Sequence, residues 1–118
     1  MQGDNEFHSK FKSLMDRFVF EVYDNTKNFP KEEVYSLTSQ LRRAALSVIL
    51  NYIEGCARQR RAVLKNFLEI SYGSLKEAKY LIYFSVRQGY LNKEKGKELL
   101  DLAEKIGAML WGILRKLK

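Results

Sequence analysis

The 118-residue chain contains one cysteine, one histidine and one proline, and it has no long apolar run. A single cysteine, Cys56, excludes an intrachain disulfide framework and a thiolate cluster for zinc, and it fits a reducing compartment. A single histidine, His8, has no Cys or second His beside it to complete a metal site, so we expect a surface histidine and no metal or other cofactor. No window approaches the roughly 18 consecutive apolar residues of a membrane span, and residues 1–10 are polar and charged. We therefore expect a cytoplasmic protein without a membrane partner.

The sequence also lacks the motifs that carry catalysis. There is no Gly-rich phosphate loop, no nucleophile elbow, no HExxH and no ExxH pair of the kind that builds di-iron bundles. Glu54 with Glu69 or Glu77 is the one candidate carboxylate pair, but solvated glutamates on helices are far commoner. The sequence therefore predicts no catalytic residues and a protein that acts by binding.

Apolar residues recur at steps of three and four, which predicts helices over about residues 7–28, 31–58, 62–88 and 92–117. Pro30 punctuates the first boundary, Gly89 suits the left-handed C′ position after the third helix, and Asn92 suits the N-cap of the fourth. No strand pattern is present. Short connections between helices of this length favour antiparallel neighbours. Residues 1–118 are therefore predicted to form one all-α domain, an antiparallel up-down-up-down four-helix bundle.

Two of the predicted helices carry more apolar residues than one bundle seam requires. A second stripe lies beyond the main face of the 31–58 helix, and another lies beyond that of the 92–117 helix. Such stripes, together with amphipathic tyrosines, are typical of contacts between chains. We therefore expect a homo-oligomer whose interface includes Leu46, Ile49, Leu50 and Ile53, and Leu110, Trp111 and Leu114.

A polar stripe interrupts the apolar surface of the 31–58 helix. At about 100° per residue, Arg43, Ser47, Asn51, Glu54 and Arg58 fall within a wedge of roughly 80°. In the structural interpretation, Ser47, Asn51 and Glu54 form a hydrogen-bonded strip against another helix or along a subunit contact. In the functional interpretation they line a polar groove.

Positive charge is concentrated in one part of the chain, which carries a net +7 overall. Between positions 42 and 65 there are six basic residues against one acid, Glu54. Arginine grips phosphate oxygens in pairs, and Tyr52, Tyr72 and Tyr90 offer stacking faces for bases. The alternative is a solvated inter-helix loop. We expect phosphate contacts to RNA or DNA from Arg42, Arg43, Arg58, Arg60, Arg61 and Lys65.

Several short motifs in order resemble one family, the four-helix-bundle family of 23S rRNA intervening-sequence proteins. The likeness lies in the run 40–47 (QLRRAALS) continuing through Asn51, Glu54-Gly55 and Arg58, in Phe29-Pro30 with Glu33, in 67–68 and 72–75 with Glu77, and in 89–91. One departure is visible, because many relatives have a proline after the positions of Ser47-Val48, where this chain has Ile49 and Leu50. Arg42, Arg43 and Arg58 match the motif, whereas Arg60, Arg61 and Lys65 are assigned from the charge pattern alone.

The resemblance implies a four-helix bundle that assembles into a ring, usually a pentamer, with basic surface for nucleic acid. The family is also similar to the accessory variability protein of diversity-generating retroelements, which partners a reverse transcriptase. The leading hypothesis is thus a non-enzymatic nucleic-acid-binding or accessory protein on a homo-oligomeric ring. The alternative is a protein-binding scaffold or adaptor, for example for a reverse transcriptase, with no direct role on nucleic acid.

Overall fold

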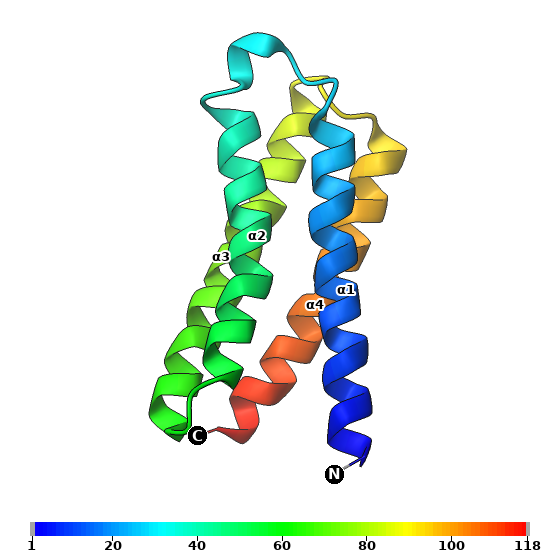
Figure 1. Cartoon of the computed structure of the whole chain (residues 1–118). Helices are drawn as coiled ribbons and strands as arrows, with labels where there is room; N and C mark the ends of the chain where they lie inside the picture. Colours follow the sequence, from blue (N-terminus) through cyan, green and yellow to red (C-terminus); the bar gives the residue numbers. More distant parts are fainter. Residues whose placement is uncertain (1, 118) are drawn as a thin grey trace.

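The computed structural model describes residues 2–117, with side chains described from Glu6 onward. Four helices, α1 (Gln2–Thr26), α2 (Leu37–Cys56), α3 (Arg61–Arg87) and α4 (Lys93–Lys116), are joined by short connections, and a 3₁₀ turn, η1 (Lys31–Glu33), precedes α2. Consecutive helices run in opposite directions, so the fold is the predicted up-down-up-down bundle (Figure 1). No strand occurs within residues 2–117.

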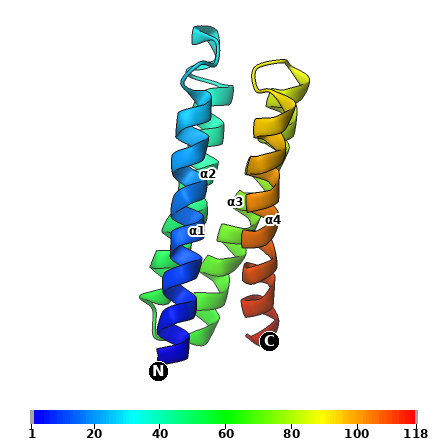
Figure 2. The ribbon, with the colours of Figure 1, turned by 90° about the vertical axis from the view of Figure 1, so that its right-hand side faces the viewer.

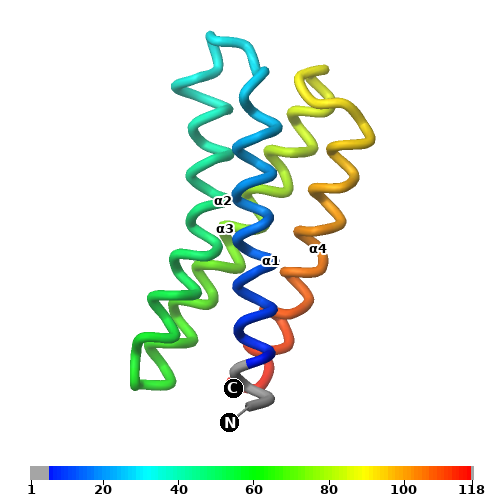
Figure 3. The backbone as a smooth tube through the Cα atoms, turned by 45° about the vertical axis from the view of Figure 1, so that its right-hand side comes forward, coloured from blue at the N-terminus to red at the C-terminus, as the bar shows by residue number. Residues whose placement is uncertain are grey.

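Each helix packs against its neighbours in the chain, and α1 also packs against α4. Within the described residues the diagonal pairs α1/α3 and α2/α4 do not approach, so the helices occupy the corners of a square in chain order. Figure 3 shows α1 in front, between α2 and α4. The molecule is elongated, with extents of 44 × 24 × 19 Å. One end carries the α2–α3 connection and the end of α4, and the other end carries η1 and the α3–α4 turn (Figure 2).

The core consists of one apolar stripe from each helix, at the predicted spacing of three and four residues. Burying these stripes against one another is the main stabilising term, at about 25 cal/mol per Å² of apolar surface. The central buried residues are Phe11, Met15, Phe18 and Val22 of α1, Leu41, Ala45, Val48 and Tyr52 of α2, Leu68, Leu75, Ala78 and Ile82 of α3, and Leu99, Ile106, Leu110 and Leu114 of α4.

The α2–α3 pair is held close by small residues where the two helices meet. A Cβ on Gly55 would lie 3.0 Å from the Cβ of Phe67, so a larger residue there would have to push Phe67 away. Further along, Ser71 Oγ donates a hydrogen bond to the Val48 carbonyl at 2.6 Å. Gly73 of α3 is different, because apart from its chain neighbours and the backbone of its own helix no atom lies within 4 Å of the position of a Cβ there.

The helix-end signals in the α3–α4 turn are confirmed. Gly89 has φ +81°, the left-handed conformation that favours glycine, and its amide donates to the Val86 carbonyl. Asn92 is the N-cap of α4, because its Oδ1 accepts the Lys95 amide at 2.7 Å.

The predicted start of the second helix at residue 31 is wrong. Residues 31–33 form only the 3₁₀ turn, and the chain turns again before α2 begins at Leu37. The Glu33 carboxylate accepts hydrogen bonds from the Ser36 hydroxyl at 2.6 Å and the Leu37 amide at 3.4 Å. The Glu33 carboxylate thus lies beside the first turn of α2, where the positive end of the helix dipole favours a negative charge.

The stripe assignment on α4 also needs correction. Leu110 and Leu114, expected on an outer stripe, are buried in the core at 0% and 8% exposure. After Ile106 the buried residues of α4 are spaced four apart, at Leu110 and Leu114. The apolar pattern of the sequence equally allows a buried face through Met109 and Ile113. Of the three expected outer residues, only Trp111 is exposed, at 50%.

Candidate nucleic-acid interface

The polar stripe of α2 lies along α3. Ser47 Oγ is 2.6 Å from Ser74 Oγ, and Asn51 Nδ2 donates to both the carbonyl and the hydroxyl of Ser47 at 2.9 Å. Arg43 pairs with Glu77 of α3 at 3.3 Å, with both side chains exposed. The polar groups of Ser47 and Asn51, in the middle of this stripe, therefore already have hydrogen-bond partners within the protein.

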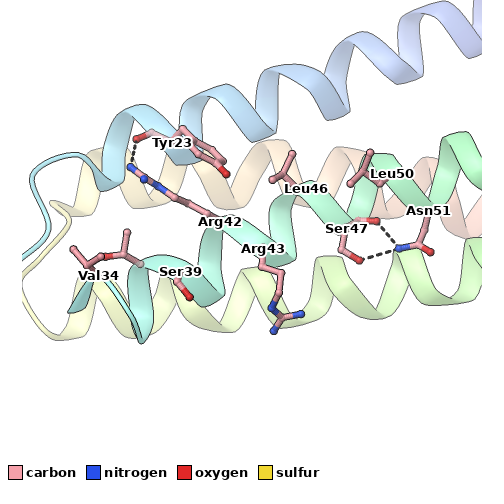
Figure 4. A pocket seen from close by; sticks show the side chains of 10 residues that line it. Tyr23, Val34, Ser39, Arg42, Arg43, Leu46, Ser47, Leu50 and Asn51 are labelled. Atoms are coloured by element: carbon pink, nitrogen blue, oxygen red, sulfur yellow. Dashed lines mark hydrogen bonds between the residues drawn. The ribbon is translucent and has the colours of Figure 1, made fainter. Parts of the chain in front are cut away.

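Arg42 is directed at the end of α1. Its Nε donates to Thr26 Oγ1 at 2.8 Å, and its Nη2 donates to the Tyr23 carbonyl at 3.2 Å. The guanidinium also lies over the Tyr23 ring, 4.5 Å from the centroid (Figure 4). The last turn of α1 has no basic residue of its own. Arg42 therefore supplies the positive charge that the negative end of the α1 helix dipole favours. The Arg42 guanidinium is therefore half-buried, and Thr26 and Tyr23 already bind it.

The six predicted cations do not form one cluster. Arg43 and the end of α2 at Cys56 are 13 residues apart, which is about 20 Å at the helical rise of 1.5 Å per residue. Arg42 and Arg43 therefore lie toward the η1 end of the bundle. Arg58, Arg60, Arg61 and Lys65 lie at the other end, around the α2–α3 connection.

The end of α4 brings two further cations to that second group. Arg61 Nη2 donates a hydrogen bond to the Lys116 carbonyl, so the start of α3 contacts the last turn of α4. Arg115 and Lys116 are exposed there. The sequence analysis did not group these two residues with the 58–65 segment, because they are some 50 residues away in sequence. We call Arg58, Arg60, Arg61, Lys65, Arg115 and Lys116 the basic end.

Only one of these six cations is paired with an acid among the described side chains. Arg58 pairs with Glu54, as its i,i+4 spacing predicts, and its guanidinium also lies 5.2 Å from the centroid of the Phe67 ring. Within the described part of the chain, the other five have no carboxylate within 4 Å. Uncompensated charge of one sign at one end of a molecule attracts polyanions.

The three tyrosines considered for base stacking are separated by the fold. Tyr52 is 1% exposed in the core, where burial raises the pKa of its hydroxyl, so it offers no face to a ligand. Tyr90 lies at the η1 end, and its hydroxyl donates to Glu33 Oε2 at 3.2 Å. Tyr72 of α3 is half-buried beside Trp111 of α4, with 6.3 Å between ring centroids.

The outer apolar stripe of α2 is exposed at two of its four predicted residues, Leu50 and Ile53, whereas Leu46 and Ile49 are half-buried against the core. Leu50 and Ile53 are 56% and 44% exposed, and Val34 before the helix is 44% exposed. Next to this stripe an open cavity of about 580 Å³ lies over the outer face of α2 (Figure 4). It is lined by Tyr23, Val34, Thr38, Ser39, Arg42, Arg43, Leu46, Ser47, Leu50 and Asn51.

His8 is exposed, as expected, and the thiol-bearing Cys56 is exposed too. His8 Nδ1 shares a hydrogen bond with the Tyr52 hydroxyl. No three His, Cys, Asp or Glu side chains gather as a metal site among the described residues. None of the helices described is long and apolar enough to cross a membrane.

Comparison with known proteins gives a family and a fold. The family model of the 23S rRNA-intervening sequence protein matches residues 9–112. A crystal structure of a protein of unknown function from the S23 ribosomal protein family of Bacteroides thetaiotaomicron superposes with a TM-score of 0.79 at 21% sequence identity. The match covers 88% of this chain and 97% of the other. No curated protein matches the sequence.

Proposed function

The chain belongs to the 23S rRNA-intervening sequence protein family, and we propose that it is a non-enzymatic accessory protein that binds nucleic acid through its basic end. Five cations without an acidic partner among the described side chains, drawn from the α2–α3 connection and the end of α4, carry the proposal. Arginine and lysine in such a cluster neutralise phosphates and release counterions, which provides affinity without reading sequence. We propose no catalytic step for this protein. We also propose that it acts in the cytoplasm.

The proposal includes a homo-oligomer, in keeping with the ring, usually a pentamer, that the family resemblance implies. The surface that supports it is the outer stripe of α2, where Leu50 and Ile53 are exposed beside the half-buried Leu46, because exposed apolar stripes of this kind are typical of subunit contacts. A ring repeats the basic end once per subunit, so that several weak phosphate contacts act together on one nucleic acid. Arg42 and Arg43 lie beside this stripe, toward the η1 end and away from the α2–α3 connection. The phosphate contacts are therefore assigned to the other four predicted cations with Arg115 and Lys116.

The test is fluorescence anisotropy of labelled RNA and DNA over a series of salt concentrations. Replacing Arg60, Arg115 and Lys116 together by glutamine is expected to weaken binding at least tenfold. On a duplex, the slope of log affinity against log salt should become shallower by about 0.9 for each phosphate that the variant no longer neutralises. The matched control replaces Lys93, Lys95 and Lys97 by glutamine, the same charge change at the opposite end of α4. Equal weakening in both variants would show that only net charge matters, and no binding at low salt would refute the proposal.

Light scattering tests the assembly. The unaltered protein is expected to have a mass several times the 13.9 kDa of one chain, and Leu50→Glu is expected to reduce it toward one chain. Ile70→Glu changes a similarly exposed residue of α3 outside the stripe and is expected to leave the mass unchanged. A single-chain mass for the unaltered protein at micromolar concentration would refute the oligomer.

One observation favours a second candidate function, a scaffold that binds a partner protein such as a reverse transcriptase. The cavity over α2 combines exposed apolar residues with arginines, as protein-binding surfaces do. Binding of that kind would depend little on salt. It would also be abolished in Leu50→Glu and kept in the Arg60, Arg115 and Lys116 variant.

A further inference from the structure

On the side of the bundle away from α1 and α2, α3 and α4 form a second hollow that the basic end does not include. A cavity of about 250 Å³ lies there, lined by Tyr72, Leu75, Lys76, Lys79, Glu104, Gly107, Ala108 and Trp111. The hollow faces away from α1 and α2 because the four helices occupy the corners of a square in chain order, without diagonal contacts within the described residues. The outer face of α2 therefore does not include this hollow.

Aromatic rings form one wall of the hollow. Half of the Trp111 surface is exposed, and the Tyr72 ring stands 6.3 Å from it, centroid to centroid, at an interplanar angle of 37°. Gly107 and Ala108 are small residues just before Trp111 on α4, so no bulky group covers the indole from these positions. A Cβ on Gly107 would lie 3.3 Å from Leu75 Cδ2, which shows how closely α3 and α4 approach at the floor.

Two lysines of α3 lie next to the aromatic rings in the same lining. Lys76 Nζ lies 5.2 Å from the centroid of the Tyr72 ring and has no carboxylate within 4 Å among the described side chains. Lys79 pairs with Glu104, whose pKa is lowered by the hydrogen bond from that ammonium group. The lining thus has two cations against one anion. Arg115 of the basic end follows Trp111 by one turn on the same side of α4, about 6 Å along the axis.

We propose that the Tyr72–Trp111 hollow is a stacking site for an unpaired base of single-stranded nucleic acid, with Lys76 and Arg115 on the neighbouring phosphates. Every base has a π face, so stacking on an exposed indole accepts any sequence but requires an unpaired base. A base in a duplex is stacked on its neighbours and cannot occupy the hollow without being extruded, which costs free energy. This inference rests on the proposed nucleic-acid function and adds a preference that the basic end alone does not give, for single strands over duplex.

The chain has a single tryptophan, so its intrinsic fluorescence reports on this site directly. Oligothymidylate is expected to quench Trp111 fluorescence saturably. An abasic oligonucleotide of the same length is expected to bind the basic end without quenching, and a duplex is expected to do the same. Saturable single-strand binding with unchanged fluorescence would overturn the stacking site while leaving the basic end in place.

A matched pair of variants separates this site from the basic end. Trp111→Leu is expected to reduce oligothymidylate affinity about tenfold, the effect of one base that can no longer stack, and to leave duplex affinity within twofold. Tyr35→Leu removes an aromatic ring that is 95% exposed at the η1 end and is expected to change neither affinity. Equal affinity of Trp111→Leu and the unaltered protein for single strands would overturn the inference.

The mass of Trp111→Leu and the binding of the unaltered protein also test the inference. A lower mass of Trp111→Leu in light scattering would show that the hollow is a contact between copies of the chain, which also overturns the inference. If the unaltered protein binds neither single strands nor duplex, the proposed function fails and this inference fails with it.

Discussion

The guanidinium of Arg61, the first residue of α3, donates a hydrogen bond to the main-chain carbonyl of Lys116, the last residue of α4. The bond satisfies one of the carbonyls that a helix end leaves without an intrahelical partner, and it places a cation at the negative end of the α4 dipole. It also assembles the basic end from segments at positions 58–65 and 115–116.

Replacing Arg61 by glutamine tests the contribution of this bond to stability. Because the pair is exposed, we expect a decrease of only about 0.5 kcal/mol in the free energy of unfolding, measured by urea denaturation. Arg60→Gln removes the same charge from the neighbouring position, where no side-chain hydrogen bond is present in the described structure, and should leave stability unchanged. Equal effects of the two substitutions would show that the Arg61–Lys116 bond contributes nothing measurable.

Two glycines on helices should respond oppositely to alanine. Gly55→Ala places a Cβ 3.0 Å from Phe67 Cβ and 3.2 Å from Leu64 Cδ1, and we expect destabilisation of about 1–2 kcal/mol because α2 and α3 must move apart. Gly73→Ala meets no atom within 4 Å, so better helix propensity should stabilise the protein by about 0.5–1 kcal/mol. Thermal or urea denaturation measures both, and stabilisation by Gly55→Ala would contradict the close α2–α3 approach.

Two buried threonines should also differ when replaced by the isosteric valine. Thr38 Oγ1 is the only buried side-chain oxygen or nitrogen without a hydrogen bond among the described residues, so Thr38→Val should be neutral or stabilising by up to about 1 kcal/mol. Thr26 Oγ1 donates to the Val22 carbonyl at 2.9 Å and accepts from Arg42. Thr26→Val should therefore cost about 1–2 kcal/mol in urea denaturation. A decrease in Thr38→Val as large as that in Thr26→Val would show that the Thr38 hydroxyl has a partner in solution.

Stability should depend on pH through Glu33. The hydrogen bond from Ser36, with weaker ones from the Leu37 amide and the Tyr90 hydroxyl, lowers the pKa of Glu33 below 4.5. A carboxyl whose folded-state pKa is lowered stabilises the protein above its unfolded pKa, and this stabilisation disappears as the pH falls through the folded pKa.

Denaturation from neutral pH to well below pH 4.5 measures this effect. Glu33→Gln should reduce stability at neutral pH and flatten its decline in acid. Glu32→Gln removes a neighbouring charge without these hydrogen bonds and should keep the decline of the unaltered protein. An unchanged acid profile in Glu33→Gln would contradict the assignment.

Much of the fold follows from local sequence. The steps of three and four predicted all four helices, and α3 and α4 begin and end within a residue of the predicted bounds. Gly89 and Asn92 marked their turn correctly because the left-handed conformation and the side-chain cap are properties of the residue and its immediate neighbours. The start of α2 was missed because it depends on where the Glu33 side chain reaches, which the period of apolar residues does not encode.

The candidate site was only half predictable. Arg58, Arg60, Arg61 and Lys65 were found because they are close in sequence, whereas Arg115 and Lys116 join them only because α3 and α4 are antiparallel and their ends meet. Arg42, one residue from Arg43, turns instead to the last turn of α1. The sequence by itself determined the existence of the four helices, the caps of the α3–α4 turn and the excess of positive charge, because these depend on spacing, on local residue type and on composition. Tertiary structure decided which cations share an end, which leucines of α4 are buried, and that Trp111 lies beside Tyr72 in an open hollow, because each of these depends on which helix faces lie against one another.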